Sequence, residues 1–429
     1  MKKLYKKPEA GDKIEVSLGS EKQVGIYLNV HEKGFLLLKL DNGYNIGINK
    51  ENITEIKILE KFKKIEDKEE IKFKGNKPII DFYITGGTIS SKLDASTGGV
   101  SNLVSSKEFF LMYPEIFEIA DVRIKSPFSK QSEDMIPSDW IRIAKLVGKS
   151  LNDTNVKGVI ISHGTDTLHY TASALSFMLG KLNKPVVLTY SQRSSDRGSS
   201  DARLNLICAN YAALSDMAEV MVVGHGTIND DYCYALQANK CRKMHSSRRD
   251  AFRAINCKPF AKIFSDGKIE NIRTDFNKRN KEKIHVDAVF DSKVGIFKSH
   301  PGNNIKIIDF YKKNMKGLII EGTGLGHVAI NGKYGLISEL RKAINKGLFI
   351  YMTNQTIYGR VDPYVYSSGR KLLKLGIVYL EDMLTETAFV KLGWVLGHKE
   401  WRGSVITKIK MLENINGEFN NRLGNEFLN

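Results

Sequence analysis

Residues 79–90 read IIDFYITGGTIS, an apolar run that stops abruptly at Thr85-Gly86-Gly87-Thr88. A short run of β-branched and aromatic residues is typical of a strand that is buried on both faces of a parallel sheet. The two glycines allow the backbone to turn sharply and to approach a ligand closely. Because open α/β sheets bind ligands at the carboxyl ends of their strands, we expect the two threonine hydroxyls to lie at a site.

A second stretch of the chain has the same construction. Residues 156–162 (VKGVIIS) form another apolar run, which ends in His163-Gly164-Thr165-Asp166-Thr167 before a helical pattern begins near Leu168. Two strands of one sheet would bring their threonine-bearing ends to the same edge. The sequence therefore predicts one site that is built from both loops.

From residue 79 onward, strand and helix patterns alternate, which is typical of the α/β class. A helix capped by Ser138 is expected, because Trp140, Ala144, Val147 and Leu151 follow at helical spacing. A long basic and polar region, 238–283, is expected to separate a larger first α/β unit from a smaller second one. The other expected strands are 185–190, 219–223, 294–297, 317–321 and 348–352, and the other expected helices are 168–182, 201–214, 333–346 and 382–397.

The first 75 residues or so have a different pattern from the rest of the chain. Short alternating segments lie at 13–16, 24–28, 34–40 and 44–48, and the turn signal Asn42-Gly43 joins two of them. This pattern predicts a small antiparallel barrel. We therefore expect a small β-barrel domain at 1–75, an α/β domain with the catalytic residues at 76–285, and a second α/β domain at 286–429.

Composition places the chain among ordinary globular proteins. It has 429 residues, of which 42% are hydrophobic and 26% are charged, enough for two or three domains. No apolar run reaches the roughly 18 to 20 residues of a membrane span, so we expect a cytoplasmic protein without membrane contact. The four cysteines and nine histidines lack metal-ligand spacing, and no metal site is expected. The net charge of +17 could reflect a nucleic-acid partner, or it could reflect only a proteome that is rich in lysine.

Hydrolysis of a primary carboxamide needs a nucleophile, a base and donors for the developing oxyanion. The chain has no GxSxG elbow, so its nucleophile would be a threonine activated by an adjacent base. The pair TGGTI and HGTDT resembles the two threonine motifs of the bacterial-type L-asparaginases and their relatives, over about residues 78–400. This resemblance implies an asparaginase-like fold of two α/β domains, here preceded by the small all-β barrel.

The resemblance also implies the site residues. Thr88 matches the family's nucleophilic threonine, and Thr165 and Asp166 match the threonine and aspartate of HGTDT. Lys243, which precedes Met244-His245-Ser246-Ser247, matches the catalytic lysine. These four are the expected catalytic residues.

The substrate contacts are carried over in the same way. Ser132 and Glu133 resemble the residues that hold the substrate's α-carboxylate and α-amino group. Gly87, in the turn after the first strand, is expected to bind substrate with its backbone.

Longer matches resemble one branch of this family, the D subunits of the archaeal Glu-tRNA(Gln) amidotransferases. The leading barrel resembles the amino-terminal extension of those subunits, which plain asparaginases lack. The other matching stretches are 243–252 (KMHSSRRDAF), 358–361 (YGRV), 365–370 (VYSSGR), 381–384 (EDML) and 394–398 (WVLGH).

Membership in this branch implies a division of labour. The chain would hydrolyse glutamine without a cofactor of its own and pass ammonia to an E subunit. That partner would use ATP and Mg²⁺ to convert Glu-tRNA(Gln) to Gln-tRNA(Gln). The expected assembly is a homodimer core inside a heterotetramer of two D and two E subunits.

One position departs from the family pattern. The mobile loop after TGGTI usually carries a tyrosine that activates the nucleophile, but this chain has Ala95 there. Another hydroxyl such as that of Tyr113 could replace it, a partner could complete the site, or the free subunit could hydrolyse poorly. The basic cluster of Arg242, Lys243, Arg248, Arg249 and Arg253 is either a solvated face or a contact for the tRNA backbone.

Two alternatives to the amidotransferase subunit stay open. A free-standing cytoplasmic L-asparaginase would hydrolyse asparagine rapidly without a partner and would not need the barrel. A catalytically silent scaffold, supported by the missing loop tyrosine, would bind RNA through the barrel and the basic surface.

Overall fold

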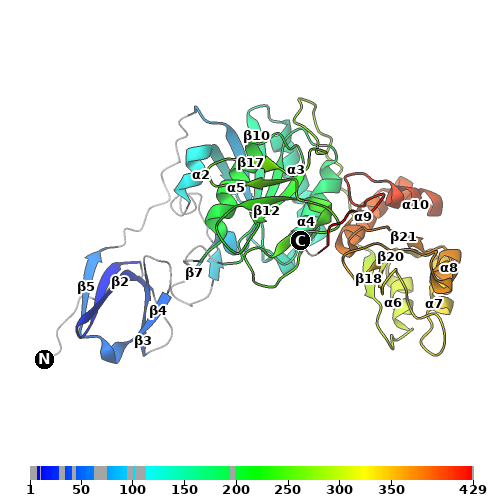
Figure 1. Ribbon diagram of the computed structural model, residues 1–429, viewed down its shortest axis with the longest axis horizontal. Helices are drawn as coiled ribbons and strands as arrows, with labels where there is room; N and C mark the ends of the chain where they lie inside the picture. The colour runs from blue at the N-terminus through cyan, green and yellow to red at the C-terminus, as the bar shows by residue number, and fades with distance from the viewer. Residues whose placement is uncertain are drawn as a thin grey trace.

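The computed structural model describes residues 7–9, 11–28, 34–40, 45–61, 75–93, 100–102, 113–193 and 199–427. Two α/β domains lie against each other, and the amino-terminal strands, drawn in blue, lie to one side of them (Figure 1). Among the described residues, no helix has both the length and the apolar character that crossing a membrane requires. The α/β class and the preceding all-β region agree with the sequence.

The amino-terminal region is an antiparallel sheet of five strands in the order β4-β3-β2-β1-β5. Its small core is formed by alternating inward residues of these strands, Ile14, Val16, Leu36, Leu38 and Ile48. The expected turn at Asn42-Gly43 lies outside the described residues, although β3 and β4 pair as its hairpin requires. The strands are β1 (Lys13–Leu18), β2 (Glu21–Leu28), β3 (Phe35–Lys39), β4 (Asn45–Asn49) and β5 (Glu55–Glu60).

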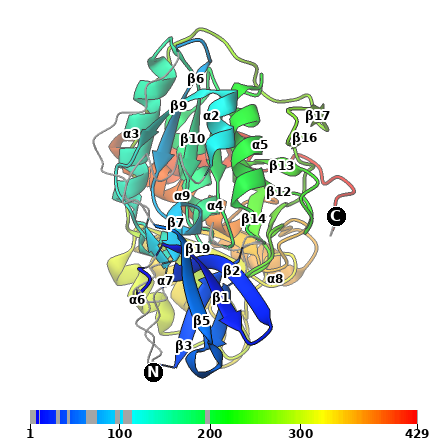
Figure 2. The same ribbon diagram turned by 90° about the vertical axis from the view of Figure 1, so that its left-hand side faces the viewer.

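The larger α/β domain is built on an eight-stranded sheet in the order β17-β16-β13-β12-β11-β10-β6-β9. Strands β9, β6, β10, β11 and β12 run parallel, and helices cover the sheet on both faces (Figure 2). The parallel strands are β6 (Ile79–Ile84), β9 (Asp121–Lys125), β10 (Val156–Ser162), β11 (Val186–Thr189) and β12 (Val220–His225). The helices are α2 (Pro114–Ile119), α3 (Pro137–Asn152), α4 (Leu168–Leu179) and α5 (Ala202–Leu214).

The two strands that the sequence singled out are direct neighbours. In the parallel register of β6 and β10, Ile84 lies opposite Ser162, so both strands end at the same level. The Thr85 hydroxyl donates to the Ser162 carbonyl over 2.7 Å and fixes this pairing at the edge. The loops after Ile84 and Ser162 therefore start side by side, as predicted.

Several helix boundaries differ from the sequence predictions: the helices expected at 333–346 and 382–397 begin at Ile337 and Thr385, and two other differences have a clear local cause. Ser138 does not cap α3, because the helix begins one residue earlier at Pro137 and Ile136 is the capping residue. The Asp139 carboxylate accepts from the Ile136 backbone N–H over 3.0 Å and satisfies that donor instead. Helix α4 ends at Leu179, three residues short of the prediction, because Gly180 turns the backbone to φ 60°.

The polar region 238–283 is not a mere separator, which corrects that prediction. It forms two short strand pairs, of which one extends the large sheet by antiparallel strands and the other stands beside it. Polar residues are tolerated there because one pair ends the large sheet and the other forms a ribbon separate from it. The strands of these pairs are β14 (Cys241–Lys243), β15 (Phe252–Ala254), β16 (Ala261–Ile263) and β17 (Ile269–Asn271). Strand β16 pairs with β13 (Cys233–Gln237), which precedes the region.

The smaller α/β domain has a four-stranded parallel sheet in the order β18-β19-β20-β21. The strands are β18 (Val294–Lys298), β19 (Gly317–Gly322), β20 (Phe349–Asn354) and β21 (Val378–Tyr379). The helices are α6 (Ile307–Asn314), α7 (Ile337–Asn345), α8 (Ser367–Lys374), α9 (Thr385–Gly397) and α10 (Ser404–Leu412). The sequence did not predict α6, α8, α10 or the two-residue strand β21.

Helices α4 and α9 join the two α/β domains through one apolar core. Phe177 of α4 stacks on Trp394 of α9 with ring centroids 5.8 Å apart, and both side chains are buried. The carboxyl-terminal tail crosses the same junction, where Glu418 forms a fully buried ion pair with Lys391 of α9 over 2.6 Å. The smaller domain is therefore held rigidly against the helix that follows the HGTDT loop.

Candidate active site

The loop after β6 turns through two glycines that no other residue could replace easily. Gly86 has φ 121° and Gly87 has φ 85°, a backbone conformation that favours glycine. A side chain at Gly87 would also place its Cβ only 2.5 Å from the Gly164 nitrogen. The glycines therefore let the TGGT loop pack directly on the HGTDT loop, and they place Thr88 at the start of the short helix η2 (Thr88–Ser90).

Three of the four expected catalytic residues are in direct contact. The Lys243 Nζ lies 2.7 Å from the Thr165 Oγ1 and 2.7 Å from the Asp166 Oδ1. The Lys243 side chain is only 11% exposed, whereas the Asp166 side chain is 62% exposed. An amine that touches both a hydroxyl and a carboxylate can move a proton between substrate and hydroxyl while the carboxylate holds its charge.

Lys243 is far from Thr165 and Asp166 in the sequence. It ends the strand β14, which pairs with β15 in a two-stranded ribbon. Its partners Thr165 and Asp166 lie 78 and 77 residues earlier, directly after the parallel strand β10. The contact therefore depends on how the polar region after β13 folds back over the strand ends.

Ser132 and Glu133, the expected substrate contacts, differ in how the structure places them. Ser132 is buried, its Oγ accepts from the Asp166 N–H over 3.2 Å, and its carbonyl accepts from the Thr167 hydroxyl over 2.5 Å. Glu133 follows in the short helix η3 (Ser132–Asp134), and its side chain is exposed to solvent. Ser132 thus orders the HGTDT loop, and the Glu133 carboxylate lies at the surface beside it.

A buried polar chain beneath the HGTDT loop was not predicted from the sequence. His163 donates to or accepts from the Thr171 hydroxyl at its Nε2 over 2.8 Å, and its Nδ1 lies 2.7 Å from the Gly164 carbonyl. The Trp140 indole N–H donates to the same Thr171 hydroxyl over 3.0 Å. Burial lowers the pKa of His163 to about 4, so the ring is neutral at pH 7 and shapes the loop without adding charge.

A cavity of about 450 Å³ opens beside the Lys243 contact. Asp166 and Lys243 line it together with residues from both α/β domains. The Arg242 guanidinium lies 2.9 Å from the Glu386 carboxylate, which comes from α9 of the smaller domain. The other lining residues are His169, Tyr170, Met244, His245 and Ser246.

The loop position Ala95 lies outside the described residues. Tyr113, one suggested replacement for the missing loop tyrosine, is buried, and its hydroxyl donates to the Ile89 carbonyl over 3.3 Å. Ile89 directly follows Thr88, so the Tyr113 ring lies under the helical turn that carries the expected nucleophile.

Each cation of the basic cluster around Lys243 contacts a carboxylate of the same chain. Arg248 and Arg253 both pair with Asp250, and Arg249 pairs with Asp230 over 2.8 Å. Together with the partners of Arg242 and Lys243, these contacts show an internal ion-pair network rather than a face of unpaired cations. The structure thus weakens the interpretation of this cluster as a tRNA contact.

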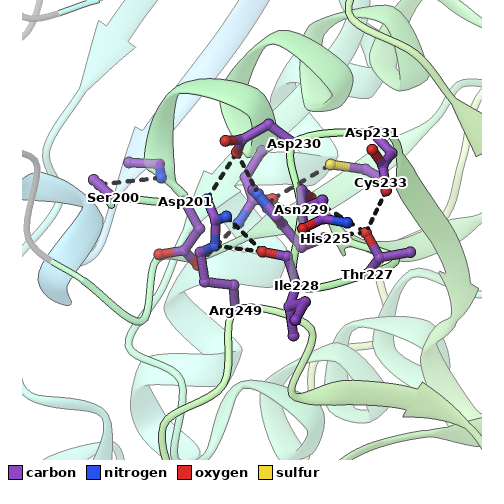
Figure 3. A network of polar contacts seen from close by, with 12 residues as sticks. Ser200, Asp201, His225, Thr227, Ile228, Asn229, Asp230, Asp231, Cys233 and Arg249 are labelled. Atoms are coloured by element: carbon purple, nitrogen blue, oxygen red, sulfur yellow. Dashed lines mark hydrogen bonds and ion pairs between the residues drawn. The ribbon is translucent and has the colours of Figure 1, made fainter. Parts of the chain in front are cut away.

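Figure 3 shows how this network ties the segment after Lys243 to the end of β12. The Arg249 Nε donates to the Ile228 carbonyl over 3.0 Å. The His225 ring lies between Asn205, 2.6 Å from its Nδ1, and Asp230, 3.0 Å from its Nε2. Burial lowers the pKa of His225, while hydrogen bonding to Asp230 opposes this shift. His225 therefore links α5 to the loop after β12 as a structural residue.

No metal centre accompanies these residues in the part of the chain that the structure describes. Nowhere in that part do three or more His, Cys, Asp or Glu side chains gather in a way that could hold a metal ion.

Three family models match the chain in succession. They are described as the GatD N-terminal domain at residues 8–59, asparaginase N-terminal at 80–277, and glutaminase/asparaginase C-terminal domain at 293–408. The first model covers the antiparallel sheet, and the other two cover the α/β domains. The contact of Lys243 with Thr165 and Asp166 lies inside the second match.

Curated relatives extend over nearly the whole chain. The D subunit of the glutamyl-tRNA(Gln) amidotransferase of Pyrococcus furiosus is 50% identical over 399 residues, which are 91% of this chain and 88% of that protein. The corresponding D subunit of Methanobrevibacter smithii is 43% identical over 419 residues, which are 96% of this chain and 94% of that protein.

A solved structure shows which part the asparaginases share. The thermostable L-asparaginase from Thermococcus kodakarensis superposes with a TM-score of 0.71 at 27% identity. The match covers 80% of this chain and 100% of that protein, so this chain has an additional portion that the asparaginase lacks. With this fold, these domains and these relatives, the chain belongs to the asparaginase-like family formed by the D subunits of glutamyl-tRNA(Gln) amidotransferases.

Proposed function

We propose that this chain is the glutamine-hydrolysing subunit of a tRNA-dependent amidotransferase that converts Glu-tRNA(Gln) to Gln-tRNA(Gln). The observation that carries the proposal is the contact of Lys243 with Thr165 and Asp166, beside the TGGT loop, in a chain of this family. Such a group of side chains suits attack on a carboxamide, and glutamine supplies that group.

The residues divide the hydrolytic work as follows. The Thr88 Oγ1 attacks the side-chain carbonyl carbon of glutamine, and Lys243 helps to remove the proton through Thr165. The Gly87 N–H faces the developing oxyanion. The amide nitrogen takes up a proton and leaves as ammonia, and water then cleaves the threonine ester to give glutamate. Ser132, Glu133 and Asp166 hold the α-carboxylate and α-amino group of glutamine.

The ammonia goes to a partner, the E subunit of the amidotransferase. This partner activates the glutamate on Glu-tRNA(Gln) with ATP and Mg²⁺, so the chain itself needs no cofactor. The assembly is a heterotetramer of two D and two E subunits around a homodimer core, and it acts in the cytoplasm. The four cysteines, which are all free thiols, suit that reducing compartment.

The experiment that tests this function measures ammonia release from glutamine by the purified chain. It is run with and without the E subunit, ATP and Glu-tRNA(Gln), and asparagine is the comparison substrate. The expected result is slow release by the chain alone and a rise of about tenfold or more with the complete system. Fast release that ignores the partner and prefers asparagine would instead identify a free-standing L-asparaginase. That alternative is kept because the α/β domains superpose on one.

A further inference from the structure

The strand that carries Lys243 is too short to hold its own position. Strand β14 has three residues and pairs only with the three residues of β15, in a ribbon separate from the large sheet. An isolated two-stranded ribbon is marginally stable at best. The position of the Lys243 amine must therefore be fixed by contacts from other elements.

The smaller domain supplies these contacts to three residues that lie shortly before Lys243 in the chain. The Thr387 hydroxyl donates to the Asn239 carbonyl over 3.0 Å. Asp382 pairs with Lys240 over 2.6 Å, and Glu386 pairs with Arg242 over 2.9 Å. Thr387, Asp382 and Glu386 all come from the start of α9 or the turn before it. One short segment of the smaller domain therefore contacts Arg242 of β14 and the two residues that directly precede this strand.

Glu386 is the member of this group with the least stabilising surroundings. Its side chain is 8% exposed, and one carboxylate oxygen, Oε2, is buried without a hydrogen-bond partner among the described residues. Burial raises the pKa of Glu386, the nearby charge of Glu321 adds to this, and Arg242 opposes it. A buried carboxylate with an unpartnered oxygen costs stability, although its place in the first turn of α9 offsets part of that cost.

We propose that Glu386 is a positioning residue for Lys243. Its carboxylate holds the Arg242 guanidinium and so fixes the neighbouring Lys243 with its amine against the Thr165 hydroxyl. The inference rests on the proposed function, because it concerns the same reaction. It gives the smaller domain a part in catalysis, although Lys243, Thr165 and Asp166 all belong to the larger one.

The physical reason for an effect on rate is geometric. Lys243 must stay within hydrogen-bond distance of Thr165 while it handles a proton, and a shift of about 1 Å can cost on the order of a hundredfold in rate. Without Glu386, the Arg242 side chain, which is 27% exposed, can turn toward water and release the strand. Substrate binding depends on other residues, so the effect should fall on kcat and leave KM in place.

The test compares Glu386→Gln, Arg242→Gln and the double variant in the complex with the E subunit. We expect each single variant to lower kcat for glutamine hydrolysis about tenfold with KM changed less than about twofold. Because Glu386 acts through Arg242, the double variant should be no slower than the single ones. The complete amidotransferase assay, with ATP and Glu-tRNA(Gln), should show the same loss.

Glu418→Gln is the matched control. It also removes a charge from a buried ion pair of α9, the pair with Lys391, but it does not contact β14. We expect it to lower Tm and leave kcat unchanged. The proposal is overturned if Glu386→Gln lowers only Tm, if it changes KM alone, or if the effects of Glu386→Gln and Arg242→Gln on kcat are additive. A native complex that releases no ammonia from glutamine would overturn the proposed function itself, which is a different result.

Discussion

Lys243 is the side chain through which the HGTDT loop and the polar region after β13 meet. Its amine contacts Thr165 and Asp166 at 2.7 Å each and is largely withdrawn from solvent. Because no other basic residue contacts the Thr165 hydroxyl within the described chain, loss of Lys243 would remove the proton acceptor of the proposed reaction. We expect Lys243→Ala to lower kcat for glutamine by about three or more powers of ten.

Single-turnover ammonia release, with circular dichroism as a check of folding, measures this effect. Lys268→Ala is the control, since Lys268 forms an exposed ion pair with Glu270. The control should keep the native rate. Activity of Lys243→Ala within about tenfold of the native enzyme would show that another group accepts the proton.

His169 links the site cavity to the pH dependence of stability. Burial, with smaller contributions from Arg242, His163 and Lys243, lowers the pKa of His169 from 6.5 to about 3. A base with a depressed folded-state pKa stabilises the fold above pH 6.5, and this stabilisation is lost as the pH falls toward 3. The free energy of unfolding should therefore decrease by up to about 1.4 kcal/mol per pH unit below 6.5 because of this group.

Urea unfolding between pH 4.5 and 7.5 measures this slope, and His169→Phe should make it shallower. Phenylalanine keeps the ring between Tyr170 and Phe252, whose centroids lie 4.9 and 6.4 Å from that of His169. His300→Phe, at an exposed histidine, should leave the slope unchanged. An unaltered slope in His169→Phe would mean that the ring is not protonated when the chain unfolds.

At the scale of elements, the central strands could be predicted from the sequence and the peripheral ones could not. The predicted run 156–162 coincides with β10, because a strand buried on both faces is apolar along its whole length. Strands β14 to β17 were missed because they have three residues each and mixed polarity. Their existence depends on neighbours that are far away in the sequence.

The residues of the candidate site also differ in whether they could be predicted from the sequence. Thr88, Thr165 and Asp166 could be predicted as site residues because each follows a buried strand in the sequence. The structure places their two loops at one edge of the sheet. Lys243 could be identified only from its resemblance to the family motif, since it ends a short polar strand. Glu386 could not be identified, because a glutamate in the first turn of a helix is ordinary and its contact with Arg242 spans two domains.

The turn before α9 carries a buried ion pair whose removal should be costly. Asp382 accepts from Lys240, and it also accepts the backbone and side-chain N–H groups of Asn420 over 2.7 and 2.8 Å. The side chains of Lys240 and Asp382 are 1% and 0% exposed. Asp382→Asn leaves the Lys240 ammonium buried without its counter-charge, and we expect a loss of about 3–5 kcal/mol in the free energy of unfolding.

Urea denaturation monitored by tryptophan fluorescence measures this loss. Glu339→Gln is the control, because its ion pair with Lys342 is solvent-exposed and should contribute less than about 1 kcal/mol. Lys240→Met combined with Asp382→Asn should recover part of the loss, because no buried charge is then left unpaired. A loss below about 1 kcal/mol for Asp382→Asn would indicate that water reaches Lys240.

At the scale of the whole molecule, the site and the amino-terminal sheet are separate parts. The sheet has its own apolar core, and every residue with a proposed role in hydrolysis lies beyond residue 86. The tail after α10, by contrast, is bound to both α/β domains: Gln237 donates to the Asn416 carbonyl over 3.1 Å, and Glu418 pairs with Lys391. The tail should thus add to the stability of the α/β domains, whereas hydrolysis should not require the sheet.

Deletion of residues 1–75 tests this separation. The remaining chain, 76–429, contains the whole hydrolytic site and both α/β domains, so we expect its glutamine hydrolysis to stay within about threefold of the full chain. The L-asparaginase of Thermococcus kodakarensis superposes on 80% of this chain, and the amino-terminal sheet matches a domain model of the D subunits. This suggests that the sheet serves the tRNA-dependent reaction instead of hydrolysis. Formation of Gln-tRNA(Gln) in the presence of the E subunit should therefore fall at least about tenfold.

Ammonia release and Gln-tRNA(Gln) formation are measured on the same samples. A folding defect lowers both rates, whereas a loss of coupling lowers only the formation of Gln-tRNA(Gln). Equal amidation by the full and truncated chains would show that the sheet has no part in the coupled reaction.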